Sequence, residues 1–301
     1  MRVAEVSIAR GERTLAARAW GDPSNPPLLA LHGWLDNAGS FDRLAPLLAD
    51  RWYVVALDLT GHGRSSHVTS GWYHYVDYFD DLRAALDHYG WERAALLGHS
   101  LGGTLASLFA ALYPERIETL LLIEALGPLT ITPEQSLDQL RRGLDERAAF
   151  ATRRPLRVFT DLERAIDVRM AASGLSRDAA RPIVERGIDA VAGGFVWSSD
   201  PKLTLASPQR YTEVQILAML RGIRARTLLI LAEPATSYLQ ESMMEPRIAC
   251  VDEIEIVRIG GNHHLHLEAP QKVLRAIERF TLDDSGDSLT RRHSGESRNP
   301  F

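Results

Sequence analysis

The fold is decided by Gly98-His99-Ser100-Leu101-Gly102-Gly103, a stretch of the form G-x-S-x-G. It follows the apolar run at residues 94–97 and precedes an apolar, helix-like pattern at residues 102–113. Between a buried strand and a helix, this sequence predicts a sharp turn that exposes the serine hydroxyl above the sheet. The positive end of the following helix would lie beside that hydroxyl. Ser100 is therefore the candidate nucleophile.

The sequence on either side of this turn alternates between short apolar runs and helical patterns. Near-continuous apolar runs are typical of parallel strands buried on both faces. Strands that alternate with helices predict an α/β fold with a mostly parallel central sheet flanked by helices. The expected strands are residues 1–10, 13–20, 27–31, 53–57, 94–97, 118–123, 227–231 and 253–259, and the expected helices are residues 42–48, 78–89, 102–113 and 271–280.

The alternation stops at residues 128–207, which are helical in pattern, rich in Arg, Ala and acids, and show no clear buried strand. Two helices are predicted to begin near Asp161 and Ser176, where a small polar residue precedes early acids. One interpretation is an extra helical surface layer. The other is an inserted lid (cap), because ligands bind beyond the carboxyl ends of parallel strands.

The predicted domain organisation follows from these patterns. Residues 1–127 and 208–280 form the core, and residues 128–207 form the helical cap. Residues 281–301 contain few apolar side chains, which predicts a disordered tail, because so polar a segment cannot offset the entropy lost on ordering.

The composition of the 301 residues excludes several classes of protein. The single cysteine, Cys250, rules out an intrachain disulfide and a multi-cysteine zinc site. The net charge of −5 gives no reason to expect a nucleic-acid partner. No apolar run reaches the ~18 residues of a membrane span, so no membrane partner is expected. The start lacks a signal-peptide pattern, so we expect a cytoplasmic protein. We also expect a monomer or a homodimer.

Three motifs besides the serine turn resemble those of the α/β-hydrolase superfamily, and the resemblance covers about residues 3–280. They are Leu31-His32-Gly33-Trp34, similar to the oxyanion loop; the D-x-x-G-x-G-x-S turn from Asp58 to Ser65; and Gly260-Gly261-Asn262-His263, similar to the histidine loop. Within the superfamily the chain looks most like serine hydrolase-like proteins, on residues 32–37, Arg186-Gly187 and residues 195–201.

The resemblance implies which histidine is the base and which backbone groups bind the oxyanion. The family places the base seven residues before the proline of its loop, which is His263 here rather than His264 or His266. The oxyanion hole would use the backbone N–H groups of Leu101 and Trp34.

The third member of the triad departs from the commonest family pattern. Ala235 stands where most relatives have an aspartate. Some relatives place the acid after the preceding strand, where this chain has Glu124, and a carboxylate after five apolar residues is costly unless it is paired. We favour Glu124, with Glu233 as the alternative.

The resemblance implies a cofactor-free, carboxylesterase-like serine hydrolase that cleaves an ester or related acyl bond of a small molecule through an acyl-enzyme on Ser100. A metal site among His263, His264 and His266 is the rival interpretation of that loop, but no set of acidic partners is evident nearby, so no metal is expected. The alternatives are a thioesterase, a carbon–carbon bond hydrolase or a catalytically silent binding protein, the last favoured by Ala235. The sequence does not indicate the substrate.

Overall fold

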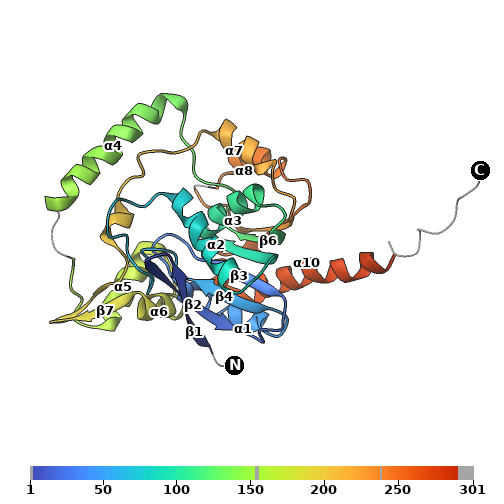
Figure 1. The fold of residues 1–301 in the computed structure, drawn as a ribbon, viewed down its shortest axis with the longest axis horizontal. Coiled ribbons are helices and arrows are strands. Elements are labelled where there is room, and N and C mark those ends of the chain that lie inside the picture. The colour runs from blue at the N-terminus through green and yellow to red at the C-terminus, as the bar shows by residue number, and fades with distance from the viewer. Residues whose placement is uncertain (1–2, 153–155, 238, 291–301) are drawn as a thin grey trace, which may run out of the picture.

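The computed structural model describes residues 3–152, 156–237 and 239–290. Its centre is an eight-stranded sheet in the order β1-β2-β4-β3-β5-β6-β9-β10 (Figure 1). β1 and β2 run antiparallel to their neighbours, and all other pairs are parallel. The strands are β1 (Ala4–Arg10), β2 (Arg13–Trp20), β3 (Pro27–Leu31), β4 (Tyr53–Leu57), β5 (Ala94–His99), β6 (Ile117–Ile123), β9 (Arg226–Glu233) and β10 (Ile254–Gly260). The predicted fold class, a mostly parallel sheet flanked by helices, is confirmed.

Successive residues of the central strands enter two different hydrophobic cores, because side chains alternate between the faces of a sheet. In β3, Leu29 and Leu31 belong to one core, and Leu28 and Ala30 belong to the other. This double burial explains why the central strands have continuous apolar sequences.

Helices cover both faces of the sheet. One core is closed by α2 (Tyr78–His88), α3 (Leu101–Leu112), α7 (Glu213–Leu220) and α8 (Glu241–Ile248). The other is closed by α1 (Ala45–Leu48), α9 (Leu265–Glu268) and α10 (Pro270–Thr290), together with the 3-10 helix η1 (Ala38–Phe41).

The inserted segment, residues 128–207, connects β6 to β9 in the sequence, and these two strands are neighbours in the sheet. The segment contains the helices α4 (Ser136–Ala148), α5 (Leu162–Ser173) and α6 (Arg177–Arg186) and the 3-10 helices η3 (Pro133–Gln135), η4 (Ala149–Thr152) and η5 (Pro201–Thr204). As predicted, α5 and α6 begin directly after Asp161 and Ser176.

The inserted segment contains no fully buried strand among the described residues, but it does contain two strands that its helical pattern did not predict. β7 (Ile188–Val191) and β8 (Gly194–Trp197) form an antiparallel hairpin. The two turn residues Ala192-Gly193, followed by Gly194, are the sequence signal, since glycines allow the positive φ of 87° and 143° found there. These strands are only partly buried or exposed, so they lack the apolar runs that marked the central strands.

The inserted segment has a small core of its own, to which α5 and α6 contribute Ile166 and Ile183 and α9 contributes Leu267. α4 takes no part in it: Gly143 is its one buried residue, and the helix lies along the outside of the molecule (Figure 1).

α10 extends beyond its predicted end at Phe280 and reaches Thr290. The first part of the expected disordered tail is therefore helical, and residues 291–301 lie outside the described residues. No helix in the described part of the chain is long and apolar enough to cross a membrane.

Candidate active site

Ser100 sits at the junction of β5 and α3 in a strained backbone conformation, with φ 53° and ψ −114°. The adjacent glycines are required by close packing. A Cβ at Gly98 would lie 2.5 Å from the carbonyl oxygen of Gly102, and one at Gly102 would lie 1.9 Å from the carbonyl oxygen of Leu31. The predicted sharp turn is present, and it raises Ser100 at the carboxyl end of the sheet.

Backbone strain is concentrated around this turn. Among the described residues, only three that are not glycine have positive φ: Leu35 at 59°, Ser100 at 53° and Glu124 at 55°. They follow β3, β5 and β6, which are neighbours in the sheet. Positive φ is unfavourable for residues with a side chain and persists where the surrounding structure enforces it, often at functional sites.

Glu124 and His263, predicted as acid and base, are in direct contact although 139 residues separate them. The Nδ1 atom of His263 lies 3.2 Å from Oε2 of the buried Glu124. Since a carboxylate only accepts hydrogen bonds, Nδ1 carries the imidazole proton and Nε2 is the unprotonated ring nitrogen. This tautomer is the one that a general base requires.

Two further donors fix the Glu124 carboxylate. The backbone N–H of Ala232 donates to Oε1 at 2.5 Å, and the hydroxyl of Thr236 donates to Oε2 at 3.1 Å. Thr236 was not singled out from the sequence. Its only sequence signal is a position one residue beyond Ala235.

The alternative acid, Glu233, is exposed at the end of β9. Its backbone carbonyl accepts from Gly261, but within the described residues its carboxylate has no hydrogen-bond or ion-pair partner. Ala235, at the usual family position of the acid, is also exposed. Of the two glutamates, the structure therefore brings only Glu124 to His263.

The residue before the nucleophile ties the histidine loop to the serine turn. The buried His99 ring lies 4.6 Å from the His263 ring, centroid to centroid, and its Nε2 donates to the His263 backbone carbonyl at 2.9 Å. His263 is thereby held beside the β5–α3 junction that carries Ser100.

The predicted oxyanion donors are Leu101, directly after Ser100, and Trp34, in the loop that follows the neighbouring strand β3. Leu101 is the first residue of α3, so its N–H has no partner within the helix. In the described part of the chain neither this N–H nor that of Trp34 has a hydrogen-bond partner. The half-exposed Trp34 indole donates to the carbonyl of Leu203 in η5, at 3.0 Å.

A group of buried polar side chains packs around the loop that follows β3. His264 and His266 surround Asp36, which also makes an ion pair with Arg169 of α5, and Ser40 Oγ lies 2.9 Å from Nε2 of His266. Burial would raise the pKa of Asp36, but the charge of Arg169 and the neighbouring histidines together more than offset it and lower that pKa.

Burial keeps the structural histidines of this group neutral. It lowers the pKa of His264 to about 4 and that of His266 to about 3. Burial, together with the neighbouring imidazoles, holds the pKa of His99 well below its usual value. In the described ranges, no three His, Cys, Asp or Glu side chains are arranged to hold a metal ion.

Comparison with known proteins finds a family profile and relatives that match most of the chain. The profile of the α/β hydrolase fold family matches residues 26–226. The chain is 33% identical over 283 residues to a serine hydrolase-like protein of Danio rerio, which covers 91% of this chain and 86% of that protein.

Solved structures of similar fold cover most of the chain. A hypothetical protein from Pseudomonas aeruginosa PAO1 is similar at 38% identity with a TM-score of 0.87, over 92% of this chain and 99% of that one. A thioesterase domain from the curacin biosynthetic pathway is similar at 26% identity with a TM-score of 0.79, again over 92% of this chain and 99% of that one.

Proposed function

The chain belongs to the α/β-hydrolase family, and from that premise we propose that it is a serine hydrolase acting on an ester or related acyl bond of a small molecule. The observation that carries the proposal is the contact between Glu124 and His263 beside a strained serine turn. A family member that had become a silent binding protein would have no need to keep this carboxylate–imidazole pair and this strain together.

The reaction follows from the tautomer of His263. Nε2 takes the proton of the Ser100 hydroxyl as Oγ attacks the substrate carbonyl. Glu124 stabilises the imidazolium that forms. The protonated Nε2 then gives its proton to the leaving group, and the acyl group remains on Ser100. A water molecule, activated by His263 in the same way, releases the acid and restores the serine.

We assign the stabilisation of the oxyanion of the tetrahedral intermediate to the backbone N–H groups of Leu101 and Trp34, which would donate hydrogen bonds to it. Both are without a partner in the described chain, and the first stands at the positive end of α3. Donors that are fixed before the reaction stabilise such a charge without reorganising, and one donor contributes about 10²–10³-fold to turnover.

The experiment is labelling with a fluorophosphonate that carries a fluorescent reporter. The wild-type protein should form a covalent adduct, and Ser100→Ala should form none while its thermal unfolding stays unchanged. Ser100→Ala should also lower kcat on an activated ester by ~10³-fold or more, because triad residues act as a unit. Wild-type protein that is folded but neither labelled nor active would point to a silent binding protein instead.

A thioesterase is the second candidate, favoured by the likeness to the curacin thioesterase domain. Both activities pass through the same acyl-enzyme, so the residues of the triad do not separate them. Matched oxygen esters and thioesters of one acyl group separate them by kcat/KM, and a clear preference for the thioester would replace the carboxylesterase assignment.

We also propose that the inserted segment is the cap of the site. The Trp34 indole donates to η5, and Asn37 donates to the carbonyl of Ile183 in α6 at 2.8 Å. The inserted segment therefore contacts the loop that follows β3. Trp34→Ala keeps the backbone N–H but removes a half-exposed ring at this junction. It should change the preference among short and long acyl chains, whereas an unchanged profile would contradict the cap assignment.

A further inference from the structure

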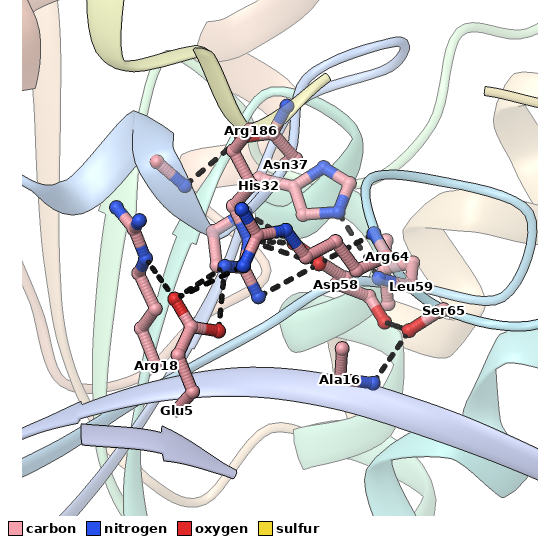
Figure 2. A network of polar contacts seen from close by, with 12 residues as sticks. Glu5, Ala16, Arg18, His32, Asn37, Asp58, Leu59, Arg64, Ser65 and Arg186 are labelled. Atoms are coloured by element: carbon pink, nitrogen blue, oxygen red, sulfur yellow. Dashed lines mark hydrogen bonds and ion pairs between the residues drawn. The ribbon is translucent and has the colours of Figure 1, made fainter. Parts of the chain in front are cut away.

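Arg186, the last residue of α6, is a fully buried arginine that connects the inserted segment to the core. Its Nε lies 2.9 and 3.0 Å from the two carboxylate oxygens of Asp58. Its Nη1 lies 2.8 and 2.9 Å from those of Glu5 in β1 (Figure 2). A single side chain from residue 186 thus joins two carboxylates that come from the first 60 residues.

Asp58 follows β4 and is as deeply buried as its partner. Besides Arg186 it accepts from the backbone N–H of Ala38 at 2.6 Å and from that of Arg64 at 2.8 Å. Ala38 begins η1, directly after the oxyanion loop, which is defined here as residues 32–37. The carboxylate that Arg186 neutralises is therefore the anchor for the far end of this loop.

The near end of the oxyanion loop is anchored by the next residue, Leu59. Its N–H donates to Nε2 of His32 at 3.1 Å, and Nδ1 of His32 donates to the carbonyl of Gly33 at 2.7 Å (Figure 2). Burial lowers the pKa of His32 and keeps it in this neutral form. Both ends of the loop that carries Trp34 are thus fixed by one dipeptide, Asp58-Leu59.

The end of α6 packs against this region without spare room. A Cβ added at Gly39 would lie 2.4 Å from the carbonyl oxygen of Pro182. A Cβ at Gly187 would lie 2.9 Å from Nδ2 of Asn37, which already donates to Ile183. A displacement of α6 therefore has to move η1 and the end of the oxyanion loop with it.

We propose that Arg186 is a positioning residue for the oxyanion hole: through Asp58 it sets the conformation of residues 32–38, and so couples the seating of the inserted segment to the placement of the Trp34 N–H. The inference rests on the proposed function for its catalytic part. Its structural part, that Arg186 holds the loop, can be measured without any activity.

The physical reason is the precision that the hole requires. A displacement of about 1 Å in a positioned group can lower turnover by ~10²-fold. Arg186→Gln would leave Asp58 buried and charged with only two backbone donors, so this anchor should shift toward other donors or water. Arg186→Lys retains the charge but cannot hold both carboxylates with a planar fork, so its effect should be intermediate.

Arg18→Gln is the matched control. Arg18 binds the same Glu5 and also Asp42, but it belongs to β2 and makes no contact with Asp58. Loss of a cation beside Glu5 is common to both substitutions, whereas loss of the Asp58 anchor occurs only at Arg186.

The first measurement separates kcat from KM on an activated ester, together with the affinity for a trifluoromethyl ketone that mimics the tetrahedral intermediate. Arg186→Gln should lower kcat by ~10²-fold and weaken ketone binding in parallel, with KM nearly unchanged, because oxyanion donors act mainly in the transition state. Arg18→Gln should retain kcat. A rise in KM at constant kcat, or an equal loss in both variants, would overturn the proposal.

The second measurement is hydrogen–deuterium exchange of the peptide covering residues 32–38, without substrate. Exchange there should be faster in Arg186→Gln and Arg186→Lys than in the wild type and in Arg18→Gln. Unchanged exchange in a folded Arg186→Lys protein overturns the proposal even if Arg186→Gln does not fold. Wild-type protein without esterase activity would defeat the proposed function alone, because the exchange still reports on the loop.

Discussion

At the scale of single residues, the site depends on positions where the backbone is forced into an unfavourable conformation. Leu35, Ser100 and Glu124 have positive φ and follow three neighbouring strands. Two of them are held by the sheet: Gly102 allows α3 to approach β3 beside Ser100, and Glu124 donates its N–H to the carbonyl of Ile230 at 2.9 Å. The strain is thus supported by the same sheet that positions the side chains.

Glu124→Gln should lower kcat on an activated ester by ~10³–10⁴-fold, because an amide keeps the shape but no longer stabilises the imidazolium. Glu233→Gln, at an exposed carboxylate, should change kcat by less than about threefold, as expected for a surface substitution. Kinetics of the two variants test the assignment. If the Glu233 variant is the impaired one, the acid is on β9. If neither is impaired, Ser100 and His263 act without an acid.

Gly102→Ala should destabilise the fold, because the new Cβ would lie 1.9 Å from the Leu31 carbonyl oxygen and neither backbone can yield easily. Overpacking of this kind costs about 1–3 kcal/mol or more. Gly260→Ala is the control, since no atom lies within 4 Å of the added Cβ. Urea unfolding of both variants measures the difference, and equal stabilities would show that the turn tolerates a side chain.

At the scale of elements, buried arginines fix the inserted segment where it leaves and rejoins the core. Arg247 of α8 donates to the carbonyls of Leu126 and Pro128 at 2.8 and 2.9 Å, and it holds Glu213 of α7 with two hydrogen bonds of 2.7 Å. Arg186, at the end of α6, attaches a further point of the segment to the core through its ion pair with Asp58. The segment is thereby attached through charges whose partners lie far away in the sequence.

Arg247→Leu should lower the free energy of unfolding by about 2–4 kcal/mol, because it leaves two buried carbonyls without their donor and Glu213 with Thr130 alone. Arg224→Leu removes an exposed cation that lies 3.7 Å from Asp252, and its cost should stay within about 1 kcal/mol. Chemical denaturation of the two proteins gives the comparison, and similar stabilities would contradict the role given to Arg247.

At the scale of the whole molecule, many histidines are buried in the neutral form. Burial lowers the pKa of His62 to about 3, that of His264 to about 4 and that of His266 to about 3. In the unfolded chain these imidazoles titrate near pH 6.5. Below that pH the histidines bind protons in the unfolded state but not in the folded state. The stability contributed by the neutral histidines is therefore present above pH 6.5 and is lost as the pH falls toward their pKa values in the folded state.

Stability should therefore decrease between pH 7.5 and 5.5. At pH 5.5 each of these three histidines costs roughly 1–2 kcal/mol. Asp81 acts in the opposite direction, because burial raises its pKa to about 6, and it offsets about 1 kcal/mol at most. The net loss is on the order of 3 kcal/mol, measured by urea unfolding at both pH values. His266→Asn should reduce this loss by roughly 1–2 kcal/mol, and stability that stays flat down to pH 5.5 would contradict the prediction.

Local sequence was enough to predict the parallel sheet, the sharp turn at Ser100 and the candidacy of Glu124, because those features are encoded by neighbouring residues. Strands buried on both faces require unbroken apolar runs, and a tight turn requires glycines at fixed spacing. The weakly buried hairpin β7–β8 and the extension of α10 to Thr290 lack such local patterns, so the sequence did not predict them.

The carboxylate that faces His263 and the cation that neutralises Asp58 are set by the three-dimensional fold. Glu124 follows β6 and Glu233 ends β9, and the fold buries the first against His263 while it leaves the second exposed. Arg186 lies 128 residues from Asp58, and one of 34 basic residues was selected by the packing of α6 on η1. A buried charge must find its partner wherever the chain brings one, and that partner is set by the fold rather than by local sequence.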